Sequence, residues 1–279
     1  MRLPVLVAAT VLSLAALAGC ADPASDPGAG GDPQRYQTDG TVLESSDHGP
    51  ELCFAVAESY PPQCSGIPLI DWDWGLVEGE ESASGTTWGD FHVEGTYDGT
   101  SITVLEAGPF RPRDVGSPDF TPPCPEPAGG WVSVDLALAT EEARVEAAMA
   151  AERESDSAGV WVDYVGEPSE GTPPEEVILV AAFTGDLERH TADLEAIWGG
   201  PLCVTQHERS LDALEGIQAE LSGHVGSELG LVVTQSWVDV VENAVVVDVI
   251  VVDDATRAAV EERYGAGAVR LVPALRSTT

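Results

Sequence analysis

The stretch Phe91-His-Val-Glu-Gly-Thr-Tyr-Asp-Gly-Thr-Ser-Ile-Thr-Val-Leu105 decides the fold class of the first half of the chain. Apolar side chains alternate with polar ones on both sides of Asp98-Gly99, namely Phe91, Val93, Tyr97, Ile102 and Val104. Such alternation is typical of a strand with one buried face, and Asp-Gly is a favoured two-residue hairpin turn. The stretch therefore predicts an antiparallel β-hairpin.

The same pattern extends on both sides of this hairpin. Strands are expected over 52–58, 67–74, 90–97 and 101–106, which predicts a small antiparallel β-barrel or sandwich over residues 41–106. Seven prolines then make 107–130 an extended connector.

Helical and strand patterns alternate from residue 131 to 279, so the chain is expected to be α+β as a whole. A helix over 140–155 should place Val145, Ala148 and Met149 on one face, and Ser210 is a plausible N-cap of a later helix. From Leu202 the order β-α-β-β-α-β predicts a ferredoxin-like α/β-sandwich, preceded by an extra strand and helix. No clear internal repeat is recognised.

The N-terminus carries the layout of a secretory signal over residues 1–19, with Arg2 followed by 16 apolar or small residues. That run is shorter than the roughly 20 residues that a membrane-spanning helix needs. Leu17-Ala-Gly-Cys20 resembles the lipobox of bacterial lipoproteins, which implies lipidation of Cys20 and anchoring on the outer face of the cytoplasmic membrane. Residues 20–40 are rich in Gly, Pro and Asp and are expected to be a flexible tether.

The charge of the chain is strongly negative. Asp and Glu number 48 against 12 basic residues, which gives a formal net charge of −36. A nucleic-acid partner needs a basic surface, so this class of partner is excluded. The acidic surface is interpreted as a solvated one that opposes association, with cation binding as the alternative.

Four cysteines remain besides Cys20. They are expected to form disulfides outside the cytoplasm, and of the three possible pairings we favour Cys53–Cys64 with Cys124–Cys203, because cysteines within one domain should meet first. No Cys-x-x-Cys occurs, which argues against a redox centre or a zinc ribbon.

Asp71-Trp72-Asp73-Trp74 is the most suggestive short motif. In a strand it would place Asp71 and Asp73 on one face, as a cation-binding or acid pair, and the two tryptophans on the other. The competing interpretation, a half-buried strand with Ile70, Trp72, Trp74 and Leu76 facing the core, is favoured.

The five histidines, His48, His92, His190, His207 and His224, show no metal-ligand spacing. His92 is expected to point outward from its strand, and His190 to lie on a solvated helix face between Asp186 and Asp193. No nucleophile elbow or phosphate-binding loop is found, so no catalytic residue, metal or cofactor is assigned.

Several blocks together resemble a group of secreted actinobacterial lipoproteins of unassigned function: LCFAVAESYPPQCSG (52–66), GTYDGTSITV (95–104), PCPEPAGGW (123–131), FTGDLERHTADLEAIWGGPLCV (183–204) and YGAGAVRLVPALR (264–276). The resemblance implies the surface address and the disulfides only. Separately, Trp237 to Val247 resembles the strand-turn-strand of the pro-regions of some secreted serine proteases, which chaperone and inhibit their own catalytic domain.

Three functions follow as hypotheses. The first is a lipid-anchored, non-catalytic protein that binds or scaffolds an unknown ligand or protein at the cell surface. The second is a cell-envelope hydrolase that uses dispersed carboxylates. The third is a protease inhibitor or chaperone related to pro-regions.

Overall fold

The computed structural model describes residues 33–112, 119–169 and 171–278. The expected signal (1–19), the lipidation site Cys20 and most of the expected tether lie outside these residues. Among the helices of the described ranges, none has the length and apolarity needed to cross a membrane.

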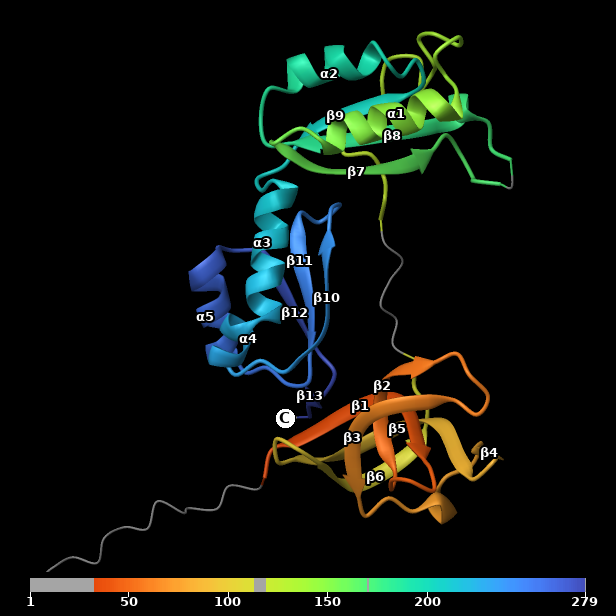
Figure 1. Cartoon of the computed structure of the whole chain (residues 1–279), viewed down its shortest axis with the longest axis vertical. Helices are drawn as coiled ribbons and strands as arrows, with labels where there is room; N and C mark the ends of the chain where they lie inside the picture. Colours follow the sequence, from red (N-terminus) through yellow and green to blue (C-terminus); the bar gives the residue numbers. More distant parts are fainter. Residues whose placement is uncertain (1–32, 113–118, 170, 279) are drawn as a thin grey trace, which may run out of the picture. The chain divides into compact units, whose positions relative to one another are not determined.

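The first half of the chain forms a ring of β-strands (Figure 1). Its elements are β1 (Arg35–Glu44), β2 (Glu51–Ala57), β3 (Gln63–Ile70), the 3-10 turn η1 (Trp74–Leu76), β4 (Glu81–Ala83), β5 (Thr86–Tyr97) and β6 (Ile102–Pro109). The strand order β1-β2-β3-β6-β5 closes on itself through pairing of β5 with β1, and β3 and β6 are parallel. A closed ring leaves few unpaired sheet edges, and its interior holds residues such as Val42, Leu52 and Phe91.

The hairpin expected around Asp98-Gly99 is confirmed, because β5 and β6 pair antiparallel with Tyr97 opposite Ile102. Its loop is longer than the two residues expected. The Asp98 carboxylate accepts hydrogen bonds from the backbone N–H groups of Thr100 and Ser101, each at 2.8 Å. Those bonds, with others from the two hydroxyl groups, hold the pKa of Asp98 far below its usual value, and they stabilise a four-residue loop instead of a tight turn.

Two strand boundaries differ from the expectation. Residues 35–40 were assigned to the tether but belong to β1, where every residue pairs with β5. The strand expected over 67–74 ends at Ile70, because Asp71 adopts a left-handed conformation (φ 63°) that an extended strand cannot continue. Asp71 and Asp73 therefore do not share one strand face.

A first α/β module follows the connector. It consists of α1 (Glu141–Glu152), β7 (Ser157–Tyr164), the 3-10 turn η2 (Pro174–Glu176), β8 (Val177–Phe183), α2 (Leu187–Glu195) and β9 (Leu202–Gln206). β7 is antiparallel to β8, and β8 is parallel to β9. Both helices cover one face of this sheet (Figure 1), where they bury Leu179, Ala181 and Phe183.

The second α/β module consists of α3 (Leu211–Ser222), α4 (His224–Glu228), β10 (Val233–Asp239), β11 (Ala244–Val249), α5 (Asp254–Tyr264) and β12 (Val269–Pro273). The expected N-cap is confirmed, since the Ser210 hydroxyl accepts a hydrogen bond from Ala213 N–H. β10 is antiparallel to β11 and β11 is parallel to β12, while α3 and α5 bury Val245, Val247 and Val249. A last strand, β13 (Arg276–Ser277), pairs with β1.

The expected ferredoxin-like unit from Leu202 onward is not formed, because β9 pairs with β8 and not with the strands that follow it. Parallel neighbours need a crossover connection, and α2 supplies one directly between β8 and β9. The two three-stranded sheets therefore repeat one topology, helix-strand-strand-helix-strand.

The face of α1 that packs on the sheet is not the one that carries Val145 and Met149. Ala147 and Ala151 face the core of the module, whereas Val145 and Met149 are exposed. Small alanine side chains allow α1 to pack closely on the sheet, which is why the bulkier residues lie on the outer face.

Both expected disulfide pairs are present at bonding distance. Cys53 and Cys64 join β2 to β3, with their Cα atoms 5.9 Å apart. Cys124 and Cys203 join the connector to β9, with a Cα–Cα distance of 5.8 Å.

Candidate functional site

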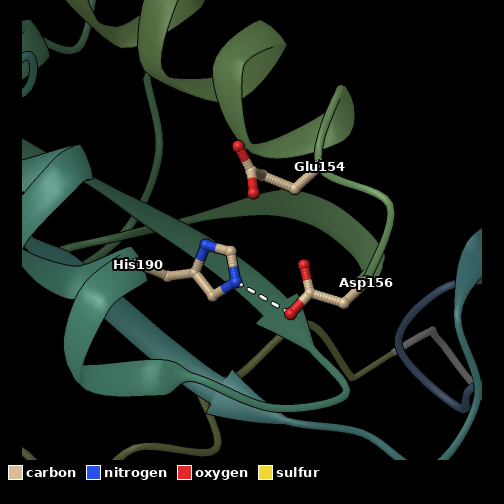
Figure 2. A group of neighbouring side chains, drawn as sticks. All are labelled: Glu154, Asp156 and His190. Atoms are coloured by element: carbon tan, nitrogen blue, oxygen red, sulfur yellow. Dashed lines mark hydrogen bonds and ion pairs between the residues drawn. The ribbon is translucent and has the colours of Figure 1, made fainter.

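The densest group of potential metal ligands in the described part of the chain lies at one end of the first module (Figure 2). Glu154 and Asp156 follow α1, and His190 belongs to α2. The imidazole Nε2 lies 2.9 Å from Oδ2 of Asp156. The ring stacks on Phe183 with a centroid distance of 3.6 Å and an interplanar angle of 3°. His190 is only 2% exposed, so the expectation of a solvated histidine is wrong.

Arginine already supplies the positive charge of this cluster. Arg189 Nη2 donates to Glu154 at 3.0 Å and lies 2.9 Å from Nε2 of His190. A metal ion bound by the same three side chains would have to displace this guanidinium, which repels cations and whose pKa is raised chiefly by the hydrogen bond to Glu154. The geometry is that of an ion-pair network.

Asp156 completes the network. Burial opposes its ionisation, but the hydrogen bond from His190 and the charges of His190 and Arg189 outweigh that effect, so the pKa of this carboxyl group lies below its ordinary value. An ionised aspartate beside a stacked imidazole could orient a general base. The ring, however, is only 2% exposed and stacks on Phe183, so substrate could not reach it without rearrangement.

A second buried histidine lies in the β-ring. His92 alternates with the core residues Phe91 and Val93 and so points away from the interior of the ring, as expected. It is nevertheless only 1% exposed, and its Nδ1 lies 3.0 Å from Asp39. Arg111 lies 3.2 Å from Nε2 of the same ring, and Arg276 on β13 donates to Asp39 at 3.3 Å. This network ties four segments of the chain together and encloses the imidazole, which indicates a structural role.

Asp71 and Asp73, the two carboxylates considered as a binding pair, have different local roles. The Asp73 side chain accepts a hydrogen bond from Gly75 N–H and caps η1, while Asp71 occupies the left-handed turn before it. Trp72 and Trp74 pack against the core with Phe91, as expected. The rest of the favoured interpretation is wrong, because the strand ends at Ile70, and Ile70 and Leu76 are 47% and 77% exposed.

A different feature emerges from the register of the two α/β modules. Trp161 on β7 lies opposite Val180 and then Cys203 in the first sheet. In the second sheet Trp237 on β10 lies opposite Val246 and then Arg270. We call these two rows the tryptophan rows; both lie on the sheet face that the helices leave open.

The two modules also share an irregularity in strand pairing. Each outer strand carries a register shift two to four residues before its tryptophan, between Ser157 and Gly159 and between Val233 and Gln235. Both tryptophans are followed by Val-Asp, at 161–163 and 237–239. The repeated Trp-Val-Asp was the one sequence signal of this internal repeat, which sequence analysis did not recognise.

The two rows differ in what covers them. On the first module, Cys124 of the connector, Trp131 directly after it, and Val240 and Val241 pack against the cluster that contains Trp161. Trp161 is 8% exposed, stacks on His207 with a centroid distance of 5.8 Å, and donates its indole N–H to the Phe120 carbonyl at 3.3 Å. On the second module Trp237 is 38% exposed, whereas Val246 beside it is 0% exposed, and neither belongs to a hydrophobic cluster of the described residues.

The charges around the second row are defined by Arg270. Its Nε donates to Glu242 at 3.0 Å, and its Nη2 lies 3.7 Å from Asp239. Two carboxylates thus surround one guanidinium, and the margin of the row carries a net negative charge. The arrangement is a half-exposed indole with an acidic border, suited to contact with another molecule.

Comparison with known proteins adds no family to these observations: no protein-family model matches the chain, and no curated protein matches it significantly.

Proposed function

We propose that this protein is a lipid-anchored, non-catalytic binding protein of the outer face of the cytoplasmic membrane, and that it holds its partner on the tryptophan row of the second α/β module. The observation that carries the proposal is Trp237, half-exposed at the position where the first module buries its own tryptophan under the connector. Exposed tryptophans are over-represented among residues that dominate binding energy at protein interfaces.

The histidines support a non-catalytic role. A general base must be within hydrogen-bond reach of its substrate, yet His190 and His92, the two histidines closest to carboxylates, are 2% and 1% exposed. The carboxylates beside them are paired with arginines, Glu154 with Arg189 and Asp39 with Arg276, which is the pattern of structural ion pairs.

The partner contact is tested by photo-crosslinking on intact cells. A photoreactive phenylalanine analogue replaces Trp237 in one variant and Tyr60, an exposed aromatic residue of the β-ring, in the control. We expect an adduct from position 237 and none from position 60. Equal adducts from both positions, or none from position 237, would refute binding through this row.

The anchor is tested by Cys20→Ser, with Ser25→Ala as the matched control. The motif Leu17-Ala-Gly-Cys20 supports lipidation of Cys20, and loss of the acylated thiol should move the protein from the membrane fraction to the medium. Retention of the Cys20→Ser variant in the membrane fraction would contradict the anchor.

A second candidate is an inhibitor or folding chaperone of a secreted serine protease. It is favoured by the likeness of Trp237 to Val247 to protease pro-regions, since this stretch covers the β10–β11 hairpin with β10 at the sheet edge. An edge strand can accept a strand from another protein. Slowing of a host protease by the mature chain, reversed by a proline within β10, would support this candidate over simple binding.

A further inference from the structure

The first module shows what kind of ligand an open sheet face of this fold accepts. The connector that lies on its tryptophan row has the sequence Asp119-Phe-Thr-Pro-Pro-Cys-Pro-Glu-Pro-Ala-Gly-Gly-Trp131, with four prolines in 13 residues. The described backbone of 119–131 forms no helix or strand. This face therefore already binds an extended, proline-rich segment of the chain itself, beside Val240 and Val241.

The contacts of the connector are chemically simple. The indole N–H of Trp161 donates to a backbone carbonyl, that of Phe120, and apolar side chains of the connector pack against the row. Proline-rich segments suit such contacts, because their carbonyl groups remain available as acceptors and little chain entropy is lost on binding. The third position of the row, Cys203, adds a covalent bond to Cys124.

The second module keeps the tryptophan and replaces the covalent bond with a polar group. Trp237 lies at the position of Trp161, and Arg270 takes the position of Cys203. Arginine presents up to five N–H donors. In Arg270, Nε donates to Glu242 and Nη2 lies near Asp239. This row can therefore bind carbonyl groups reversibly where the first row holds its ligand permanently.

We propose that the tryptophan row of the second module binds an extended, proline-containing segment of a separate surface or secreted protein, and that this segment carries basic residues. The proposal rests on the proposed function and identifies the chemistry of its partner. In the complex the indole N–H of Trp237 donates to a carbonyl group of the segment, as Trp161 does to Phe120. A basic side chain pairs with the carboxylates of Asp239 and Glu242.

Charge favours an external basic segment over a segment of the chain itself as the occupant of the row. The N-terminal residues 21–32 contain prolines, but they also carry three aspartates and no basic residue. They would add negative charge beside Asp239 and Glu242 in a protein whose net charge is already −36. Like charges at short range oppose binding, so a basic external segment is favoured.

The test is a titration of the mature chain with two synthetic peptides based on residues 120–131. One has Cys124→Arg and Glu126→Arg, and the other has Glu at both positions. The indole N–H resonance of Trp237, assigned with Trp237→Phe, is followed by two-dimensional NMR. We expect a saturable shift with the basic peptide, weaker binding of the acidic peptide, and no shift of the Trp161 resonance.

Variants and a third peptide make the result decisive. Trp237→Ala should weaken binding of the basic peptide by at least about tenfold, whereas Tyr60→Ala should leave it unchanged. A basic peptide with alanine in place of every proline should bind more weakly. Equal binding of that peptide, or binding that survives Trp237→Ala, overturns the proposal.

Two further outcomes would show which part of the proposal fails. If deletion of residues 21–32 alone shifts the Trp237 resonance, the occupant is the chain's own N-terminal segment and the proposal is wrong. If crosslinks form at position 237 on cells but none of the peptides binds, partner binding through the row stands and its proline-rich chemistry is refuted.

Discussion

Removal of the Cys124–Cys203 disulfide should destabilise the protein more than removal of Cys53–Cys64. The two bonds close loops of very different length, since their sequence separations are 79 and 11 residues. In the chain-entropy model a loop of the longer kind contributes about 4.5 kcal/mol and one of the shorter kind about 2.8 kcal/mol. The double variant Cys124→Ala/Cys203→Ala should therefore lose about 1.7 kcal/mol more than Cys53→Ala/Cys64→Ala.

Alanine is the appropriate replacement because Cys203 and Cys53 are 1% and 5% exposed, and a serine hydroxyl would be buried without a partner at either position. The packing losses are similar in the two double variants, since each pair has one buried and one half-buried cysteine. The difference between them consequently reports the loop length. Loss of connector contacts with Trp161 in the Cys124→Ala/Cys203→Ala variant can only enlarge this difference in stability.

The assay is urea unfolding followed by circular dichroism, with linear extrapolation to water. The m-value should rise more for the connector variant, because the unfolded chain gains more surface when the longer loop is opened. Mass spectrometry under non-reducing conditions verifies that the other disulfide is intact. An equal or larger loss of stability from Cys53→Ala/Cys64→Ala would refute the loop-length reasoning.

Two other predictions concern stability. Asp156→Asn should cost about 1.5–3 kcal/mol at pH 7, the usual value for a hydrogen bond to a charged group. Because the folded pKa of Asp156 is depressed, its contribution is present above the unfolded value of about 3.9 and is lost as pH falls through the folded value. Unfolding curves at pH 7 and pH 3 should thus show a smaller difference between wild type and variant at pH 3, and an unchanged difference would contradict the ion-pair assignment. Gly159→Ala should lower the urea midpoint, because Gly159 has φ +127° and a Cβ atom there would lie 2.5 Å from Cβ of Val240. Gly216→Ala, with nothing within 4 Å of the added atom, should instead stabilise α3 by about 0.5–1 kcal/mol; loss of stability in this control would show that the comparison is unsound.

Local patterns in the sequence predicted the local structure well. The alternation around Asp98-Gly99 gave the β5–β6 hairpin, and the helix signal at Ser210 gave the start of α3. These features depend on neighbours within a few residues, so propensity and capping chemistry suffice to predict them.

The environment of the histidines could not be predicted in the same way. His92 and His190 are polar side chains, yet both are buried. Their burial is possible only because Asp39 and Asp156, 53 and 34 residues away, supply hydrogen-bond acceptors. Periodicity within one strand or helix contains no information about such distant partners.

By itself the sequence determined the β-rich first half, the helices and strands of the second, and the four cysteines available for disulfides. Only the tertiary structure decided which strands pair, and so that β9 completes the first module and that Trp161 and Trp237 occupy equivalent positions. It also decided that the connector covers one of these tryptophans and leaves the other half-exposed. The physical reason is that strand pairing and the covering of a sheet face are long-range contacts, set by which surfaces meet and not by the residues adjacent in the chain.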